Sequence, residues 1–157
     1  MFLRLAGQPV LLVGGGEVGL RKARLLDKAG ARIRLVSPQI HEGFAELSGV
    51  TVLGTAFAPE QLDAVRLCIA ATDDVALNRH IAELCDARGI WVNVVDDPEA
   101  CSAVTPAIID RNPLIVAIGS GGEAPVLVRR TREQLEALLP FGLGRLASFI
   151  GRQRAHR

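Results

Sequence analysis

The sequence predicts an α/β protein in which a doubly wound parallel sheet is followed by a small α+β module. Two observations support this. Over the first two thirds of the chain, short apolar runs typical of buried strands alternate with segments whose apolar residues have helical spacing. After residues 96–98 this alternation ends, and a predicted hairpin is followed by amphipathic segments. A length of 157 residues suits one domain, or one domain with a smaller appendage.

The strands of the predicted sheet are continuous apolar runs, as expected for parallel strands buried on both faces. The first, at residues 10–13, ends in three glycines. The second, at residues 33–37, is expected to stop at Pro38, because proline cannot donate a ladder hydrogen bond. We place the other strands at residues 50–53, 67–71 and 90–95.

Helical segments connect these strands, because their apolar residues recur every three or four positions. We place them at residues 17–29, 40–48 and 74–88. The last has Thr72 or Asp73 as its candidate cap, and Gly89 closes it.

The second module begins near residue 106. Residues 107–110 and 114–118 predict a hairpin, which is followed by a helix from about residue 124 to 139. A hairpin with one helix buries little surface, so we expect it to dock on another subunit or on the first domain. The predicted domains are 1–105 for nucleotide binding, 106–140 for dimerisation and substrate, and 141–157 as the start of a C-terminal helical segment.

Composition excludes several classes of protein. The six aromatic residues include no Tyr, which argues against a stacking surface for nucleic acid. The apolar runs are far shorter than a membrane span needs, and the amino terminus lacks the apolar stretch of a signal peptide, so we expect a cytoplasmic protein. The three cysteines and three histidines have no metal-ligand spacing, so no metal site is predicted.

Charge is distributed unevenly along the chain. Residues 1–110 carry ten basic and fourteen acidic side chains, whereas residues 111–157 carry eight Arg and three Glu. An Arg-rich segment matches the phosphates or carboxylates of a polyanion. A solvated helix face with internal Glu–Arg pairs explains the same pattern and is favoured by charge alone.

The glycine motif after the first strand indicates a Rossmann-type dinucleotide site, because it lies between a buried strand and a helix. Gly14 permits a tight turn, Gly16 lets a pyrophosphate approach the backbone, and Gly19 lets the helix pack closely on the strand. The pyrophosphate is expected on the amide N–H groups of Glu17, Val18 and Gly19. A glycine-rich turn without a ligand is the less favoured alternative.

The second strand does not end in the acidic residue that usually binds the ribose of NAD. Ser37, Pro38 and Gln39 occupy that place, and the serine and glutamine side chains are candidate ribose partners. Arg34 is not clearly aimed at a 2′-phosphate, so this position leaves NAD and NADP open.

Polar residues follow the fourth and fifth strands, where a doubly wound sheet forms its ligand crevice. Thr72, Asp73 and Val94 are expected to line it. Asp96 is a candidate base that accepts a proton as hydride leaves, with an ordinary turn as an equal alternative, whereas Asp97 before proline favours the turn. The loop at residues 119–122 is either an anion-binding nest or a plain strand-to-helix turn.

Several collinear blocks resemble the amino-terminal module of siroheme synthase, the precorrin-2 dehydrogenase/sirohydrochlorin ferrochelatase family. These blocks cover most of residues 9–140 and are more specific than the glycine motif alone. They are Gly14-Gly15-Gly16-Glu17-Val18 with Arg21-Lys22-Ala23, Ala70-Ala71-Thr72-Asp73-Asp74, Asn93-Val94-Val95-Asp96, Thr105 to Arg111, and Ser120-Gly121-Gly122 with Ala124 to Leu127 and Arg129.

The resemblance implies NAD-dependent oxidation of precorrin-2 to sirohydrochlorin, and the family can also insert Fe²⁺ to give siroheme. It implies a homodimer with Asp96 as the catalytic carboxylate, and it places Ser120, Gly121, Gly122 and Arg129 near the tetrapyrrole substrate. The positive charge of the second module matches the carboxylates of that substrate.

Two readings of other classes remain open. One is an NAD(H)-sensing module that regulates a partner without turnover, which is motivated by the missing ribose acid. The other, weaker one is a nucleic-acid binder that uses the basic tail at residues 141–157.

Overall fold

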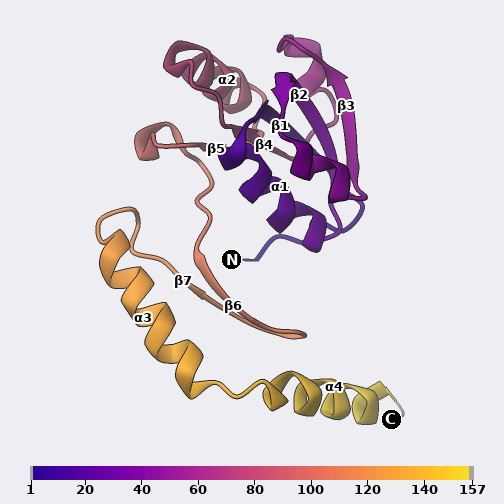
Figure 1. Cartoon of the computed structure of the whole chain (residues 1–157), viewed down its shortest axis with the longest axis vertical. Coiled ribbons are helices and arrows are strands. Elements are labelled where there is room, and N and C mark those ends of the chain that lie inside the picture. Colours follow the sequence, from indigo (N-terminus) through magenta and orange to yellow (C-terminus); the bar gives the residue numbers. More distant parts are fainter. Residues whose placement is uncertain (1, 156–157) are drawn as a thin grey trace. The chain divides into compact units, whose positions relative to one another are not determined.

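The computed structural model describes residues 2–155 and divides the chain into two compact units (Figure 1). The first unit ends at Val104 and the second begins at Thr105. The first holds the parallel sheet, and the second holds a hairpin followed by helices.

The sheet of the first unit has five parallel strands in the order β3-β2-β1-β4-β5. Their bounds are Pro9–Gly15 (β1), Arg32–Ile40 (β2), Val50–Gly54 (β3), Leu67–Ala70 (β4) and Trp91–Val94 (β5). The strand order reverses between β1 and β4, which is the switch point where ligands bind in doubly wound sheets. The predicted fold class is therefore confirmed.

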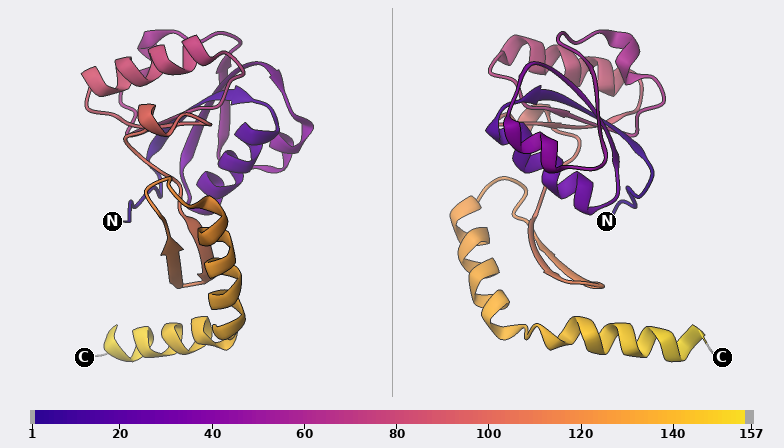
Figure 2. Two further views of the ribbon diagram at one scale, coloured as in Figure 1. Left: turned by 90° about the vertical axis from the view of Figure 1, so that its left-hand side faces the viewer. Right: turned by 45° about the vertical axis from the view of Figure 1, so that its right-hand side comes forward.

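Helices cover both faces of this sheet (Figure 2). Their bounds are Glu17–Lys28 (α1) and Val75–Ala87 (α2), with short 3-10 helices at Glu42–Glu46 (η1), Pro59–Leu62 (η2) and Pro98–Ala100 (η3). Successive residues of β1 point to opposite faces, so Val10 and Leu12 pack with α1, whereas Leu11 and Val13 pack with α2. All four are buried, as the continuous apolar run predicts.

The second strand is longer than predicted, because β2 continues through Pro38 to Ile40. Pairing of β2 with β3 ends at Val36, and β1 next pairs with β2 between Gly15 and Ile40. Pro38 thus lies where neither neighbour needs a donor, so its missing N–H costs no ladder bond.

The predicted cap of α2 is also corrected. Asp74, rather than Thr72 or Asp73, is the N-cap residue, and its carboxylate accepts a hydrogen bond from the Leu77 amide at 3.0 Å. Gly89 follows the end of the helix with a φ of +65°, as its predicted closing role requires.

The second unit confirms the predicted hairpin, in which β6 (Ala107–Arg111) pairs antiparallel with β7 (Leu114–Ile118). Two helices follow, α3 (Pro125–Leu138) and α4 (Gly142–Ala155). The last two residues of the predicted final helix lie outside the described residues. Side chains of this unit remain largely exposed, and Leu138 and Phe141 reach 74% and 84% exposure.

Arg111 is the buried polar centre of the second unit. Its guanidinium donates to the carbonyl oxygens of Glu136 (3.1 Å), Leu139 (2.9 Å) and Asp110 (3.1 Å). It also lies 4.3 Å from the centre of the Phe141 ring. One side chain therefore holds the end of α3 against the hairpin and contacts the residue just before α4.

Candidate dinucleotide site

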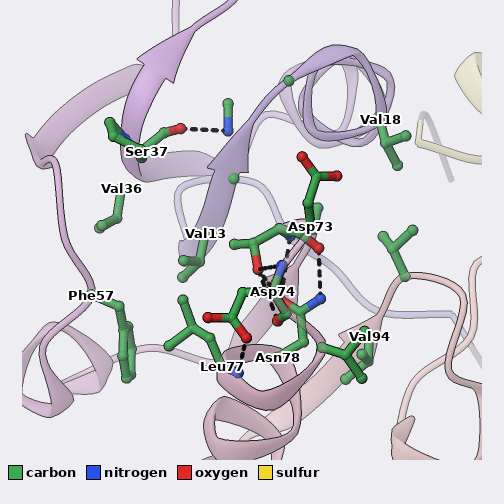
Figure 3. A pocket seen from close by; sticks show the side chains of 18 of the residues that line it. Val13, Val18, Val36, Ser37, Phe57, Asp73, Asp74, Leu77, Asn78 and Val94 are labelled. Atoms are coloured by element: carbon green, nitrogen blue, oxygen red, sulfur yellow. Dashed lines mark hydrogen bonds between the residues drawn. The ribbon is translucent and has the colours of Figure 1, made fainter.

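A cleft of about 1120 Å³ opens at the carboxyl ends of the strands (Figure 3). Its walls come from the segments that follow β1, β2, β3, β4 and β5. Of the predicted site residues, those that line it are Gly14, Gly16, Glu17, Val18, Ser37, Pro38, Gln39, Thr72, Asp73, Val94 and Asp96. The sheet thus brings these residues together, and only Gly19 of the predicted cofactor set is outside the lining.

The surroundings of three glycines in this turn explain why each lacks a side chain. Gly14 has a φ of +111°, and a Cβ there would overlap the Ala71 carbonyl. A Cβ on Gly19 would overlap the Gly14 carbonyl, so this glycine permits the close approach of α1 to β1. A Cβ on Gly16 would meet nothing within 4 Å, and this residue lines the cleft. The open space at Gly16 is the place where a phosphate group approaches the backbone.

The first turn of α1 faces this space. Gly16 is the N-cap residue and supplies no side-chain cap to the helix. The amide N–H groups of Glu17, Val18 and Gly19 belong to this uncapped turn, which favours an anion through both hydrogen bonding and the helix dipole. These features fit the pyrophosphate of a dinucleotide.

Ser37 lines the cleft and also makes two hydrogen bonds within the protein. Its hydroxyl oxygen accepts a hydrogen bond from the Gly15 amide at 2.9 Å, and its O–H donates to the Gln39 carbonyl at 2.6 Å. The single hydroxyl donor is therefore already used, and Ser37 braces the glycine turn against the end of β2 (Figure 3). Gln39 is exposed at the same edge and remains a candidate ribose partner.

Arg34 is excluded as a cleft residue. Its guanidinium donates to the Asp63 carbonyl at 3.0 Å, and it is absent from the cleft lining.

The segment after β4 is fixed by a residue that the sequence reasoning missed. Asn78 of α2 is buried, and its amide group donates to the Thr72 carbonyl at 2.8 Å and accepts from the Thr72 hydroxyl at 2.6 Å. Thr72 thus shapes the cleft through its backbone. The available signal was an Asn on the inward face of a helix that begins directly after the strand.

The apolar wall of the cleft was also missed. Phe57, from the segment after β3, and Leu77 of α2 pack beside Val36 (Figure 3). A flat base can stack on such a wall. No motif in the sequence marks Phe57, because its place depends on how the segment after β3 packs against the core.

The two acidic residues after β5 have different surroundings. Asp97 accepts a hydrogen bond from the Arg79 guanidinium at 2.8 Å, and this contact raises the pKa of Arg79. Asp96 is exposed at the cleft, and within residues 2–155 its carboxylate makes no hydrogen bond or ion pair. Asp96 also has a φ of +60°, a conformation that Asp and Asn tolerate better than most residues.

Lys22 supplies positive charge near Asp96. Partial burial lowers the pKa of the Lys22 ammonium, and the nearby Asp96 carboxylate opposes that shift. Lys22 and Asp96 are thus close enough to interact electrostatically.

The predicted substrate residues belong to the second unit. Ser120 accepts a hydrogen bond from the Ala124 amide at 3.0 Å, and Gly121 and Gly122 follow with φ values of +65° and +93°. Arg129 is exposed on α3. These contacts support a defined turn before α3, so the anion-nest and plain-turn interpretations both remain compatible with it.

Within the described part of the chain, no three His, Cys, Asp or Glu side chains gather where they would hold a metal ion. Among the same residues, no helix combines the length and apolar character that a membrane crossing requires.

Comparison with known proteins gives a consistent result. The chain is 56% identical to siroheme synthase 2 of Aeromonas salmonicida over 98% of its own length and 32% of that protein. It is 53% identical to siroheme synthase of Tolumonas auensis over 98% of its length and 33% of that protein. The chain therefore spans about a third of the curated relatives that it matches.

A solved structure titled "SirC, precorrin-2 dehydrogenase" has a similar fold, with a TM-score of 0.81 and 26% identity. The match covers 100% of this chain and 80% of that one. A family model described as "Putative NAD(P)-binding" matches residues 1–107, which include the whole of the cleft. The glycine turn, the uncapped helix and this match agree, and the chain belongs to the putative NAD(P)-binding family.

Proposed function

We propose that the chain catalyses the NAD-dependent oxidation of precorrin-2 to sirohydrochlorin. The observation that carries the proposal is Asp96, a carboxylate without a hydrogen-bond or ion-pair partner in residues 2–155, at the edge of a cleft built for a dinucleotide. The similarity to siroheme synthases and to a precorrin-2 dehydrogenase supports the choice of substrate.

The lining of the cleft supports NAD as the ligand. The amides of Glu17, Val18 and Gly19 would hold the pyrophosphate, since Gly16 leaves room for it. The wall formed by Phe57 and its neighbours would receive the adenine, and Gln39 would lie by a ribose. When bound, NAD⁺ supplies the hydride acceptor.

Asp96 would carry the proton chemistry. Oxidation of the tetrapyrrole removes one hydride and one proton, and an ionised carboxylate at the cleft can accept that proton. Lys22 would place a positive charge near this carboxylate. Asp97 is a poorer candidate because Arg79 already neutralises its charge.

Paired substitutions test this assignment. Asp96→Asn keeps a residue that tolerates the left-handed backbone, and it removes the base. We expect it to lower kcat for precorrin-2 oxidation by about 10²–10⁴-fold, measured as NADH formation, with NAD⁺ affinity unchanged.

Asp97→Asn is the matched control, for which we expect less than about a fivefold loss, because an exposed ion pair contributes little. Equal activity in Asp96→Asn and the unmodified protein would contradict the catalytic role.

A second candidate function is NAD(H) sensing without turnover. It is favoured by the end of β2, where no acidic side chain is available for the ribose. Tight NAD(H) binding by a protein that fails to oxidise precorrin-2 would support this reading instead.

We further propose that the chain acts as a homodimer in the cytoplasm and accepts Fe²⁺ as a second substrate. The exposed apolar residues of α3, α4 and the hairpin support the dimer, and three free cysteines are usual in a reducing compartment. Nitrogens of the tetrapyrrole would ligate the iron. Adding Fe²⁺ to the same assay, after oxidation is complete, separates metal insertion from dehydrogenation.

A further inference from the structure

A second hollow lies at the opposite edge of the sheet from the dinucleotide cleft. It forms at the amino ends of β1, β4 and β5 and has a volume of about 300 Å³. Its lining residues are Leu3, Arg4, Leu5, Gln8, Arg66, Leu67 and Trp91. Because parallel strands start at one edge and end at the other, this hollow shares no lining residue with the cleft.

The strand register places Leu67 and Trp91 side by side in the lining of the hollow. Val10 of β1 pairs with Leu67 of β4, which in turn pairs with Trp91 of β5, so these three residues form a row across the sheet. Val10 and Leu67 both face the α1 side, and the row places Trp91 on that side at the sheet edge. The indole is 47% exposed, which leaves much of its surface uncovered.

The chain before β1 forms the rim. The Gly7 amide donates to the Gly30 carbonyl at 2.7 Å, and Arg32 donates to the Gly7 carbonyl at 2.8 Å. The Gln8 amide donates to the Leu5 carbonyl at 2.8 Å. These bonds anchor residues 5–8 beside the strands, and Arg4, which directly precedes them, lines the hollow.

Two positive charges in the hollow lack partners. Within residues 2–155 the guanidinium groups of Arg4 and Arg66 make no hydrogen bond or ion pair, whereas Arg32, Arg34, Arg79 and Arg88 of the same unit each have one. Among the described residues that line the hollow there is no Asp or Glu. A guanidinium group binds carboxylate or phosphate oxygens, and an exposed indole stacks on a flat ring.

We propose that this hollow binds a small aromatic anion, with its ring on Trp91 and its phosphate or carboxylate between Arg4 and Arg66. A volume of about 300 Å³ is at the lower end of ligand pockets, so the hollow suits a mononucleotide or a single-ring acid rather than a dinucleotide. This site is separate from the proposed enzymatic function and does not depend on it.

Trp91 is the only tryptophan and the chain has no tyrosine, so intrinsic fluorescence reports on this hollow alone. AMP and nicotinate are the two probes. AMP tests a phosphate and nicotinate a carboxylate as the anionic group of the ligand. Adenosine and inorganic phosphate are the controls, because adenosine supplies the aromatic ring without the anion and phosphate supplies the anion without the ring. We expect saturable quenching with AMP, nicotinate or both, and half-saturation at a concentration at least about tenfold higher with adenosine or phosphate.

Arg4→Ala and Arg66→Ala should each raise the half-saturation concentration about tenfold, because each removes a charge-assisted hydrogen bond. Arg21→Ala, another exposed arginine of the first unit, is the matched control and should leave it unchanged. Far-UV circular dichroism verifies the fold of all three variants.

Three results would overturn the proposal. One is emission that neither probe changes. Another is quenching that survives in both Arg4→Ala and Arg66→Ala. The third is a blue-shifted emission that acrylamide cannot quench, which would mean that Trp91 is covered by the second unit or by another copy of the chain.

Discussion

At the scale of single residues, the glycines of the turn after β1 are required for different physical reasons. Gly14 is needed for its backbone conformation and for the adjacent Ala71 carbonyl, whereas Gly16 has an ordinary φ of −74° and open space around it. Stability and ligand binding therefore depend on different members of one motif. The motif predicts all of these glycines equally, and only the surrounding contacts distinguish them.

We expect Gly14→Ala to lower the free energy of unfolding by about 2 kcal/mol or more, because the methyl group meets the backbone at a strained φ. Gly16→Ala should cost less than about 1 kcal/mol and should weaken NAD⁺ binding at least about tenfold, since the methyl group occupies the phosphate's approach. Urea denaturation and calorimetric titration measure the two effects. Unchanged NAD⁺ affinity in Gly16→Ala would place the pyrophosphate elsewhere.

At the scale of elements, α2 does more than cover one face of the sheet. Its N-cap residue Asp74 starts the helix, and Asn78 holds the Thr72 backbone and hydroxyl at the cleft. The position of the segment after β4 is therefore coupled to the first turns of α2. A change in this helix is expected to reach the cleft without touching a ligand.

A double-mutant cycle on Asn78→Ala and Thr72→Val tests this coupling. Each single change leaves a half-buried polar partner unsatisfied and should lower the free energy of unfolding by about 1–3 kcal/mol. The double variant should cost less than the sum of the two, with an interaction energy of at least about 0.5 kcal/mol by urea denaturation. Additive effects would show that the hydrogen bonds do not hold the segment.

The sequence predicted the elements better than the side-chain partners. Alternating apolar runs were enough to predict the class of the sheet and the location of the cleft. Burial on two faces and the binding of ligands at the carboxyl ends of parallel strands are properties of whole strands. The cap at Asp74 and the role of Ser37 depend on which of several adjacent polar side chains reaches an amide. Which side chain forms the hydrogen bond depends on distances near 3 Å, and spacing in the sequence does not determine these distances.

At the scale of the whole molecule, the two units differ in how they bury their apolar residues. The first has a core on each face of its sheet, whereas the described part of the second buries few side chains, with Ile109 and Arg111 among them. Its exposed apolar residues lie on the hairpin and on both helices. A surface of this kind is expected to be covered by another protein surface.

We expect Ile115→Asp to convert the proposed homodimer to a monomer, because a charge on an exposed apolar strand opposes burial in an interface. Gln134→Asp adds the same charge at an exposed polar position of α3 and should leave the mass unchanged. Light scattering after size-exclusion chromatography measures both. A monomeric unmodified protein at micromolar concentration would rule out the dimer.

The buried guanidinium of Arg111 has a mechanical consequence for the second unit. It holds the carbonyl end of α3 and lies against Phe141, which immediately precedes α4. A planar group with several fixed donors resists torsion at this joint better than a single ammonium would. The hairpin and α3 should therefore move together as one rigid body under a pulling force. A force applied through α4 should first strain β6, the strand that carries Arg111.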